Sequence, residues 1–207
     1  MYKIKVYGLT YNTFDNYLVP TDCIKISFNQ DLAWIGGDVK FLSTEFSAIY
    51  FQKITDDLVG NLQFNAGHIA DLGNDGISVT KAYKDPGKLL RGFAVGGISP
   101  RDSSTKDAFG GNTYFSTSAE VTFPLPGIPP SLGISGGVSV NAGTLYGSDV
   151  NISGVTVSES NSLRSSAGAT IFWDSPVGPL RFDFTEVINK ELYDKDEFFQ
   201  FSGGTQF

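Results

Sequence analysis

The sequence contains no run of about 18 or more apolar residues, the length that a membrane-spanning helix requires. It also contains no convincing amphipathic helix, and its 24 glycines and 9 prolines are spread along the chain, which favours many strands joined by turns. A transmembrane helix is therefore excluded. A membrane-embedded β-barrel is not, because each of its strands needs only about 9 to 11 residues and turns half of them to the lumen.

Cysteine and clustered basic residues are scarce as well. Cys23 is the only cysteine, so the chain can build neither an internal disulfide nor a thiolate metal site. The net charge is -7 and Lys and Arg form no cluster, which argues against nucleic acid as a partner because phosphate contacts need grouped cations. The segment Met1–Val6 lacks the apolar core of a secretory signal, so either export information is missing or the chain is an excerpt.

A resemblance to a calcium-binding loop is incomplete. Asp71, Asp75 and Gly76 fit that loop, but Gly73 occupies the third ligand position and Ala82 the place of the bidentate acid. The sequence therefore predicts no metal site.

Signals for hydrolytic chemistry are equally weak. Ser103 and Lys106 have S-x-x-K spacing, but they lie in a predicted loop without the helix or companion motifs that make such a serine reactive. His68 is the only histidine and is far in sequence from any suitable serine. We predict no catalytic residue and no cofactor.

The dominant feature is the alternation of polar and apolar side chains in strand-length blocks. In the last block, Phe199, Phe201, Thr205 and Phe207 share one side, and Gln200, Ser202 and Gln206 share the other. Nine candidate strands follow, at roughly 2–11, 22–31, 39–51, 58–69, 113–123, 131–141, 162–173, 178–187 and 197–207. In a lipid-embedded barrel the polar set lines the inside, so orientation separates a barrel from a soluble sheet.

The connections between the strands alternate in length. Those at 52–57, 124–130 and 174–177 are short, whereas those at 70–112 and 142–161 are long. Outer-membrane barrels have short periplasmic turns and longer outer loops, which hairpin topology makes alternate. We therefore predict an all-β, antiparallel transmembrane β-barrel, and a loop of about 43 residues at 70–112 that is ordered and functional, because structureless connections rarely exceed about 12 to 15 residues.

Within that loop, Leu90-Arg91-Gly92-Phe93 resembles the [V/I]RGF motif of the outer-membrane protein assembly factors, the BamA-type barrel family. Gly110-Gly111-Asn112, Ser118-Ala119-Glu120, the turn Ser175–Leu180 and the terminal Phe199-Gln200-Phe201 agree with the family in order and spacing. The resemblance covers essentially the whole chain and implies the last nine strands of a 16-stranded barrel.

The resemblance implies that the loop folds back into the barrel and that its arginine meets carboxylates on the inner wall. By position, Arg91 would pair with Glu120, which the alternation also places on the polar face. The family's second acid falls at Asn141, which is a departure. Because Arg91 would then have one fewer negative partner, we predict a loop held more loosely than in the family.

The terminal strand is the second element that the resemblance singles out, through Phe201, Gly203, Gly204 and Phe207. The two glycines weaken the strand, and its free edge can pair with another strand. In the family this strand and the first form a lateral gate, through which a client barrel is built by strand addition.

The resemblance implies that residues 1–207 are the C-terminal portion of an outer-membrane barrel whose first strands and periplasmic POTRA domains are absent. The implied partners are unfolded outer-membrane barrel proteins, accessory lipoproteins of the assembly complex and the lipid bilayer. A related translocation-assembly or two-partner secretion transporter is the nearest alternative. A passive porin-like channel and a soluble β-sandwich binding module are the others.

Overall fold

The computed structural model describes residues 3–14, 20–35, 40–73, 76–84, 90–150, 154–176 and 178–203. Nine antiparallel strands form one sheet in the order β1-β2-β3-β4-β6-β7-β9-β10-β11. They are β1 (Lys3–Asn12), β2 (Cys23–Ile35), β3 (Phe41–Lys53), β4 (Val59–Asp71), β6 (Thr113–Pro124), β7 (Ile134–Tyr146), β9 (Arg164–Ser175), β10 (Gly178–Asn189) and β11 (Phe199–Gly203). Two short strands in the loops, β5 (Arg101–Asp102) and β8 (Val157–Ser158), pair separately.

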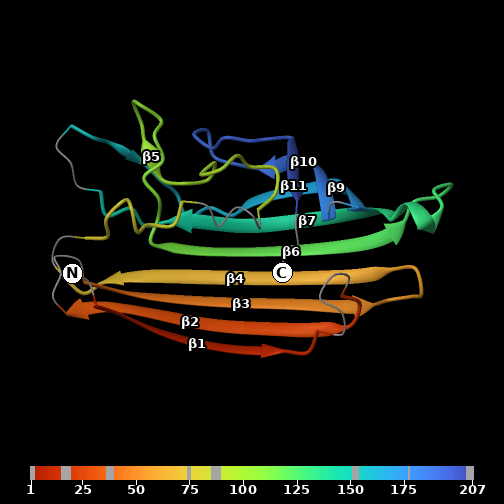
Figure 1. Cartoon of the computed structure of the whole chain (residues 1–207). Helices are drawn as coiled ribbons and strands as arrows, with labels where there is room; N and C mark the ends of the chain where they lie inside the picture. The colour runs from red at the N-terminus through yellow and green to blue at the C-terminus, as the bar shows by residue number, and fades with distance from the viewer. Residues whose placement is uncertain are drawn as a thin grey trace.

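The sheet is curved like an open trough, with β1 and β11 at its edges (Figure 1). It has the fold of a barrel segment, and it is one curved sheet rather than two packed ones, so the β-sandwich alternative is wrong. Strands β2, β3, β4 and β7 have 13 residues each, more than the about 9 to 11 that cross a bilayer, so they extend beyond it. No helix in the described ranges is long and apolar enough to span a membrane.

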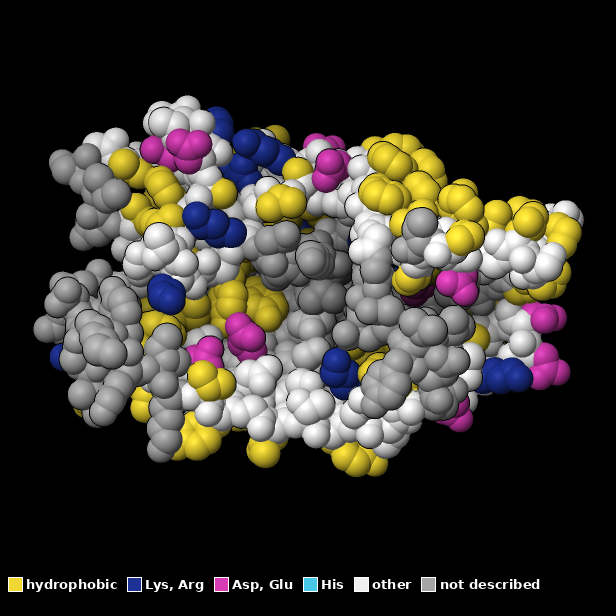
Figure 2. Space-filling view, viewed as in Figure 1, with side chains coloured by type: hydrophobic (Ala, Val, Ile, Leu, Met, Phe, Trp, Pro, Cys, Tyr) yellow, Lys and Arg dark blue, Asp and Glu magenta, His cyan; other side chains and the backbone are white. Residues whose placement is uncertain are grey.

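The two faces of the sheet have the predicted polarity. Apolar side chains on the outer face are exposed, including Leu62, Val140 and Phe201 at 54%, 58% and 58%. Polar side chains on the inner face are buried, including Ser116, Ser118, Glu120, Asn141, Ser166, Thr170, Asp183 and Thr185. Hydrophobic side chains accordingly follow the lower and upper right margins of the molecule in Figure 2. This inversion of ordinary burial is what a lipid-facing sheet requires.

All nine predicted strands are present, and the errors concern their ends. The prediction began β7 at 131, but Pro130–Leu132 form a short 3-10 turn that ends at Gly133 in the left-handed region (φ 64°). It ended β2 at 31, whereas pairing with both β1 and β3 continues that strand to Ile35. The alternation of polar and apolar residues within one strand cannot show how far pairing with a neighbouring strand extends it.

The long and short connections lie at opposite ends of the trough, as predicted (Figure 1). Two connections are exceptions. The β1–β2 connection, 13–22, is long although it lies at the short-turn end, and the β2–β3 connection, 36–40, is short although it lies at the long-loop end. The β4–β6 and β7–β9 connections are joined by the β5–β8 pair.

Candidate functional site

The motif 90–93 lies in the β4–β6 connection, against the inner face of the sheet. Leu90 and Phe93 are buried, at 0% and 3% exposed, in a cluster with Ile98 of the same connection and Leu145 of β7. Tyr83, Tyr114 and Val187 pack around this cluster. The apolar members of the motif thus fix the loop to the wall and leave the arginine between them to reach polar groups.

Arg91 reaches four polar side chains on three different strands. Its Nη1 donates to Glu120 of β6 and lies 3.5 Å from Asp183 Oδ1 of β10. Its Nη2 donates to Ser118 Oγ (2.6 Å), and its Nε donates to Asn141 Oδ1 of β7 (3.1 Å). The arginine side chain is 11% exposed and that of Glu120 is 5% exposed, so the pair is largely screened from water. The rigid guanidinium fork is therefore fixed from several directions.

A second arginine shares the same carboxylates. Arg181 Nη2 lies 2.5 Å from Glu120 Oε2, and its Nε donates to Asp183 Oδ2 at 2.8 Å. We call Arg91, Arg181, Glu120 and Asp183 the loop anchor. Asn141 accepts a hydrogen bond from Arg91, and Asp183 brings a second carboxylate near the same guanidinium from β10. The looser loop that was expected from Asn141 in place of an acid stays a prediction.

Gly92 allows the motif to approach the wall closely. Its φ is +89°, in the region that favours glycine, and a Cβ there would lie 3.0 Å from Thr185 Cγ2 and 3.3 Å from Ser166 Cβ. Ser166 Oγ also donates to the carbonyl oxygen of Arg91 at 2.6 Å. A side chain at position 92 would push the motif away from β9 and β10.

A separate arginine holds the loops at the rim of the barrel. Arg164 of β9 is 0% exposed and its Nε donates to Asp194 Oδ2, in the β10–β11 connection, at 3.0 Å. It also donates to Tyr193 Oη (2.8 Å) and to the carbonyls of Ser160 (2.8 Å) and Ser162 (3.0 Å). We call this group the rim anchor. Burial raises the pKa of the Tyr193 hydroxyl, although Arg164 opposes that shift.

The remainder of the long loop is stiffened internally. Arg101 is 1% exposed, and its Nη2 donates to the carbonyl oxygens of Gly96 and Gly97, both at 2.7 Å. Hydrogen bonds from Ser104 hold the pKa of Asp102 below its usual value, so this carboxylate stays ionised and caps the following turn. The long connection is thus ordered over its described residues, as its length predicted.

The terminal-strand residues are placed only in part. Phe201 lies on the outward face, 58% exposed, and Gly203 is the last residue of β11. Gly204 and Phe207 lie outside the described residues. Gln200, between the two outward phenylalanines, points inward and contacts the loop motif.

The residues that resemble a calcium-binding loop or a hydrolytic site make other contacts in the structure. The carboxylate of Asp71 accepts from the N–H groups of Gly73 (2.8 Å) and Gly76 (3.0 Å). Lys106 Nζ donates to the carbonyl of Ser103 at 2.6 Å, and His68 Nδ1 lies 2.8 Å from Thr113 Oγ1. Each of these contacts serves a turn or a strand pair.

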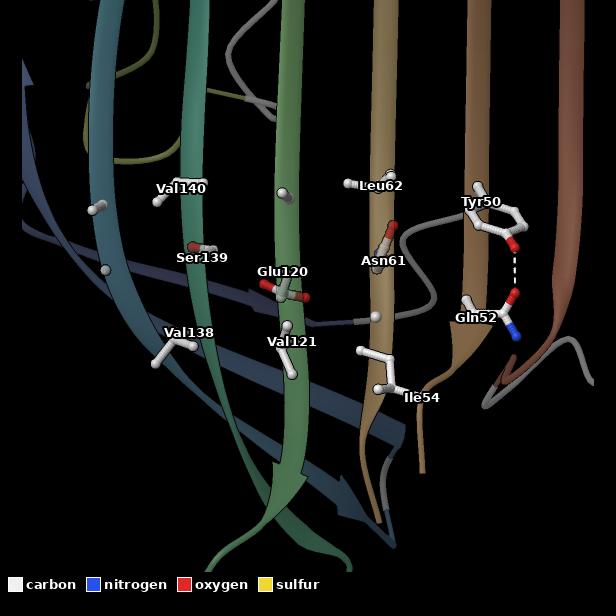
Figure 3. Close-up of a pocket in the computed structure, with 14 residues that line it drawn as sticks. Tyr50, Gln52, Ile54, Asn61, Leu62, Glu120, Val121, Val138, Ser139 and Val140 are labelled. Atoms are coloured by element: carbon white, nitrogen blue, oxygen red, sulfur yellow. Dashed lines mark hydrogen bonds between the residues drawn. The ribbon is translucent and has the colours of Figure 1, made fainter. Parts of the chain in front are cut away.

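An open hollow of about 670 Å³ lies on the outer face of β3, β4, β6, β7 and β9. Figure 3 shows the apolar side chains that line it, among them Ile54, Leu62, Val121, Val138 and Val140. Tyr50 donates a hydrogen bond to Gln52 at its margin. Its apolar lining side chains belong to the hydrocarbon-facing set, but Glu120, a member of the loop anchor, also lines the hollow, together with the buried polar residues Asn61 and Ser139.

These features define a membrane β-barrel segment whose long loop is folded inward and held by a buried arginine. Residues 5–207 match the Omp85 superfamily domain, so the chain belongs to the Omp85 superfamily.

The relatives within that superfamily are assembly proteins by name. The chain is 38% identical, over 91% of its length, to the outer membrane protein assembly factor BamA of Neorickettsia risticii, and 26% identical, over 100%, to BamA of Neisseria meningitidis serogroup B. It covers 25% and 29% of those two proteins, about a quarter of their length. The crystal structure of BamA from Haemophilus ducreyi lacking POTRA domains 1–3 has a similar fold, with a TM-score of 0.81 and 23% identity over 95% of this chain and 41% of that one.

Proposed function

We propose that the chain is the barrel portion of an outer-membrane protein assembly factor, which inserts and folds other β-barrel proteins in the outer membrane by lateral gating and strand addition. The observation that carries the proposal is the inward-folded loop, fixed by Arg91 to carboxylates on two strands of the inner wall. The terminal strand β11 is an edge of the described sheet, where a client strand can be added.

The relatives support this assignment. Two are named outer membrane protein assembly factors, and a SAM50-like protein of Schizosaccharomyces pombe is 27% identical over 88% of the chain. The chain is an outer-membrane barrel segment, and we assign it no catalytic role. Its proposed partners are unfolded outer-membrane β-barrel proteins, the accessory lipoproteins of an assembly complex and the lipid bilayer. That it is the C-terminal part of a longer protein with POTRA domains stays a prediction.

The direct test is reconstitution of the complete natural polypeptide that contains these residues into liposomes. We expect an added unfolded barrel protein to become protease-resistant, and Arg91→Ala to slow that conversion about tenfold because the loop loses charge-assisted hydrogen bonds. Lys195→Ala is the matched control, because that side chain is exposed and the hydrogen bonds of Lys195 to the loop come from its backbone. Circular dichroism first establishes that each variant retains its β-structure.

The alternatives give different outcomes. A porin-like channel would conduct steadily in planar bilayers and leave the added barrel protein protease-sensitive. A translocation or secretion transporter would move a soluble passenger across the liposome membrane without inserting a second barrel. Either result would replace the assembly-factor proposal.

A further inference from the structure

The side chain of Gln200, on the terminal strand, contacts the backbone of the loop motif. Its Nε2 donates to the carbonyl oxygen of Phe93 at 2.7 Å, and its Oε1 accepts from the N–H group of Gly92 at 3.4 Å. A carboxamide offers both a donor and an acceptor, so it can occupy the place of one peptide group in a strand pair. Gln200 thereby connects two segments that are more than one hundred residues apart in sequence.

The segment that leads into β11 extends this contact. Glu197 N–H donates to the carbonyl of Gly92 (2.8 Å), Ala94 N–H donates to the carbonyl of Lys195 (3.0 Å), and Lys195 N–H donates to the carbonyl of Gly97 (3.0 Å). Phe93 and Asp196 form an antiparallel bridge between them. A side chain at position 97 would collide with the carbonyl of Lys195, so the glycine is needed for this approach.

The terminal strand pairs with β10 along one edge of the sheet. Over the residues that the structure describes, which end at Gly203, five pairs from Leu180↔Gly203 to Phe184↔Phe199 join β11 to β10. One further hydrogen bond, from Thr185 N–H to the carbonyl of Phe198, continues the link. Within the described part of the chain, the contacts with the loop motif thus add to the β10 pairs in holding β11 and its lead-in in place.

We propose that Gln200 is a positioning residue that couples docking of the loop motif to pairing of the terminal strand. Displacement of β11 breaks the hydrogen bonds that hold Gly92 and Phe93, and release of the motif removes support from β11. Such coupling is reciprocal, because a perturbation at either site changes the equilibrium at the other by the same factor. Its consequence for lateral gating rests on the proposed function, whereas the coupling itself does not.

Hydrogen exchange on the complete natural polypeptide in lipid bilayers tests the coupling. In Gln200→Leu we expect amide exchange to rise about fivefold in both 90–101 and 195–203, because two hydrogen bonds to the motif are lost. Gln200→Asn, whose amide is one methylene too short to reach both groups, should show a smaller rise in the same two segments. Gln63→Leu is the matched control, as a half-buried inner-face glutamine of β4, and should leave both segments unchanged.

The reciprocal experiment perturbs the other end of the coupling. Glu120→Gln weakens the hold on Arg91 and changes no residue of the β10–β11 pair, yet we expect it to raise exchange in 195–203 together with 90–101. If Gln200→Leu accelerates exchange in 195–203 alone, or Glu120→Gln in 90–101 alone, the coupling does not exist. If exchange rises in both segments as expected but the liposome assembly assay fails, the proposed function is overturned and the coupling stands.

Discussion

Arg91 and Arg164 both fix a loop to the inner side of the barrel, but their partners differ in one respect that governs how easily each loop can leave. Arg164 and Asp194 are each other's charged partners, and both side chains are 0% exposed. Arg91 shares Glu120 and Asp183 with Arg181, which belongs to the wall itself. When the loop motif departs, the two acids still have a cation beside them.

The free-energy cost of opening follows from that difference. Breaking a buried pair by removing one partner typically costs about 3–5 kcal/mol, because the remaining charge is left uncompensated. Separating Arg164 from Asp194 in the rim anchor would incur this whole cost. In the loop anchor the cost is smaller, since Arg181 continues to compensate both carboxylates, so the loop is ordered yet releasable.

The largest effect is expected when both cations of the loop anchor are removed. Arg91→Ala combined with Arg181→Ala leaves Glu120 and Asp183 without a cation, so we expect a loss of more than about 4 kcal/mol in unfolding free energy. The loss should exceed the sum of the two single variants. Urea unfolding in lipid vesicles measures it, and simple additivity would mean that the arginines do not substitute for one another.

Arg164→Ala should come next, with a loss of about 3–5 kcal/mol, because buried Asp194 loses its charged partner. Protease cleavage should also appear in 154–163 and 190–198, the connections that this arginine joins. Arg164→Lys, which keeps the charge but not the fork, is the comparison variant. An unfolding free energy close to wild type would show that the rim anchor is dispensable.

Arg91→Ala alone should cost less, about 2 kcal/mol, since only the charge-assisted hydrogen bonds of one guanidinium are lost. The same unfolding titration, with protease sensitivity of 90–101, measures this. A cost equal to that of Arg164→Ala would contradict the role given to Arg181.

The smallest effect is expected for Asn141→Asp, which places an acid at the position where the family resemblance implies one. The new carboxylate keeps the hydrogen bond from Arg91 Nε, now with a charge on the acceptor, but it loses the one that Asn141 donates to Ser166, and it adds a third acid to two arginines. We expect a change within about 1 kcal/mol and similar protection of 90–101 from protease. Much stronger protection would mean that the loop of the native chain is indeed held loosely.

The fold was largely predictable because alternation reports the face on which each side chain lies. It placed Glu120 on the polar face correctly. It could not show that Arg181 meets Glu120, because β7 and β9 lie between their strands and only the curvature of the sheet brings them together. The partner of Arg91 on β6 followed from a family resemblance rather than from periodicity.

The rim anchor illustrates the same limit. Arg164 lies on a strand, where alternation applies, whereas Asp194 lies in a connection, where it does not. The pairing of the 195–197 segment with the loop motif depends on backbone groups, which carry no signal in the identity of the side chains.

The loop anchor has two guanidinium groups and two carboxylates, so its formal charges cancel. Salt weakens contacts between exposed ions, such as Lys190 with Asp196, but it acts far less on ions that are shut away from solvent. Raising the ionic strength should therefore do little to release the loop. An incoming polypeptide that presents its own acid or amide to Arg91 can instead exchange one set of partners for another, without any ion having to enter water.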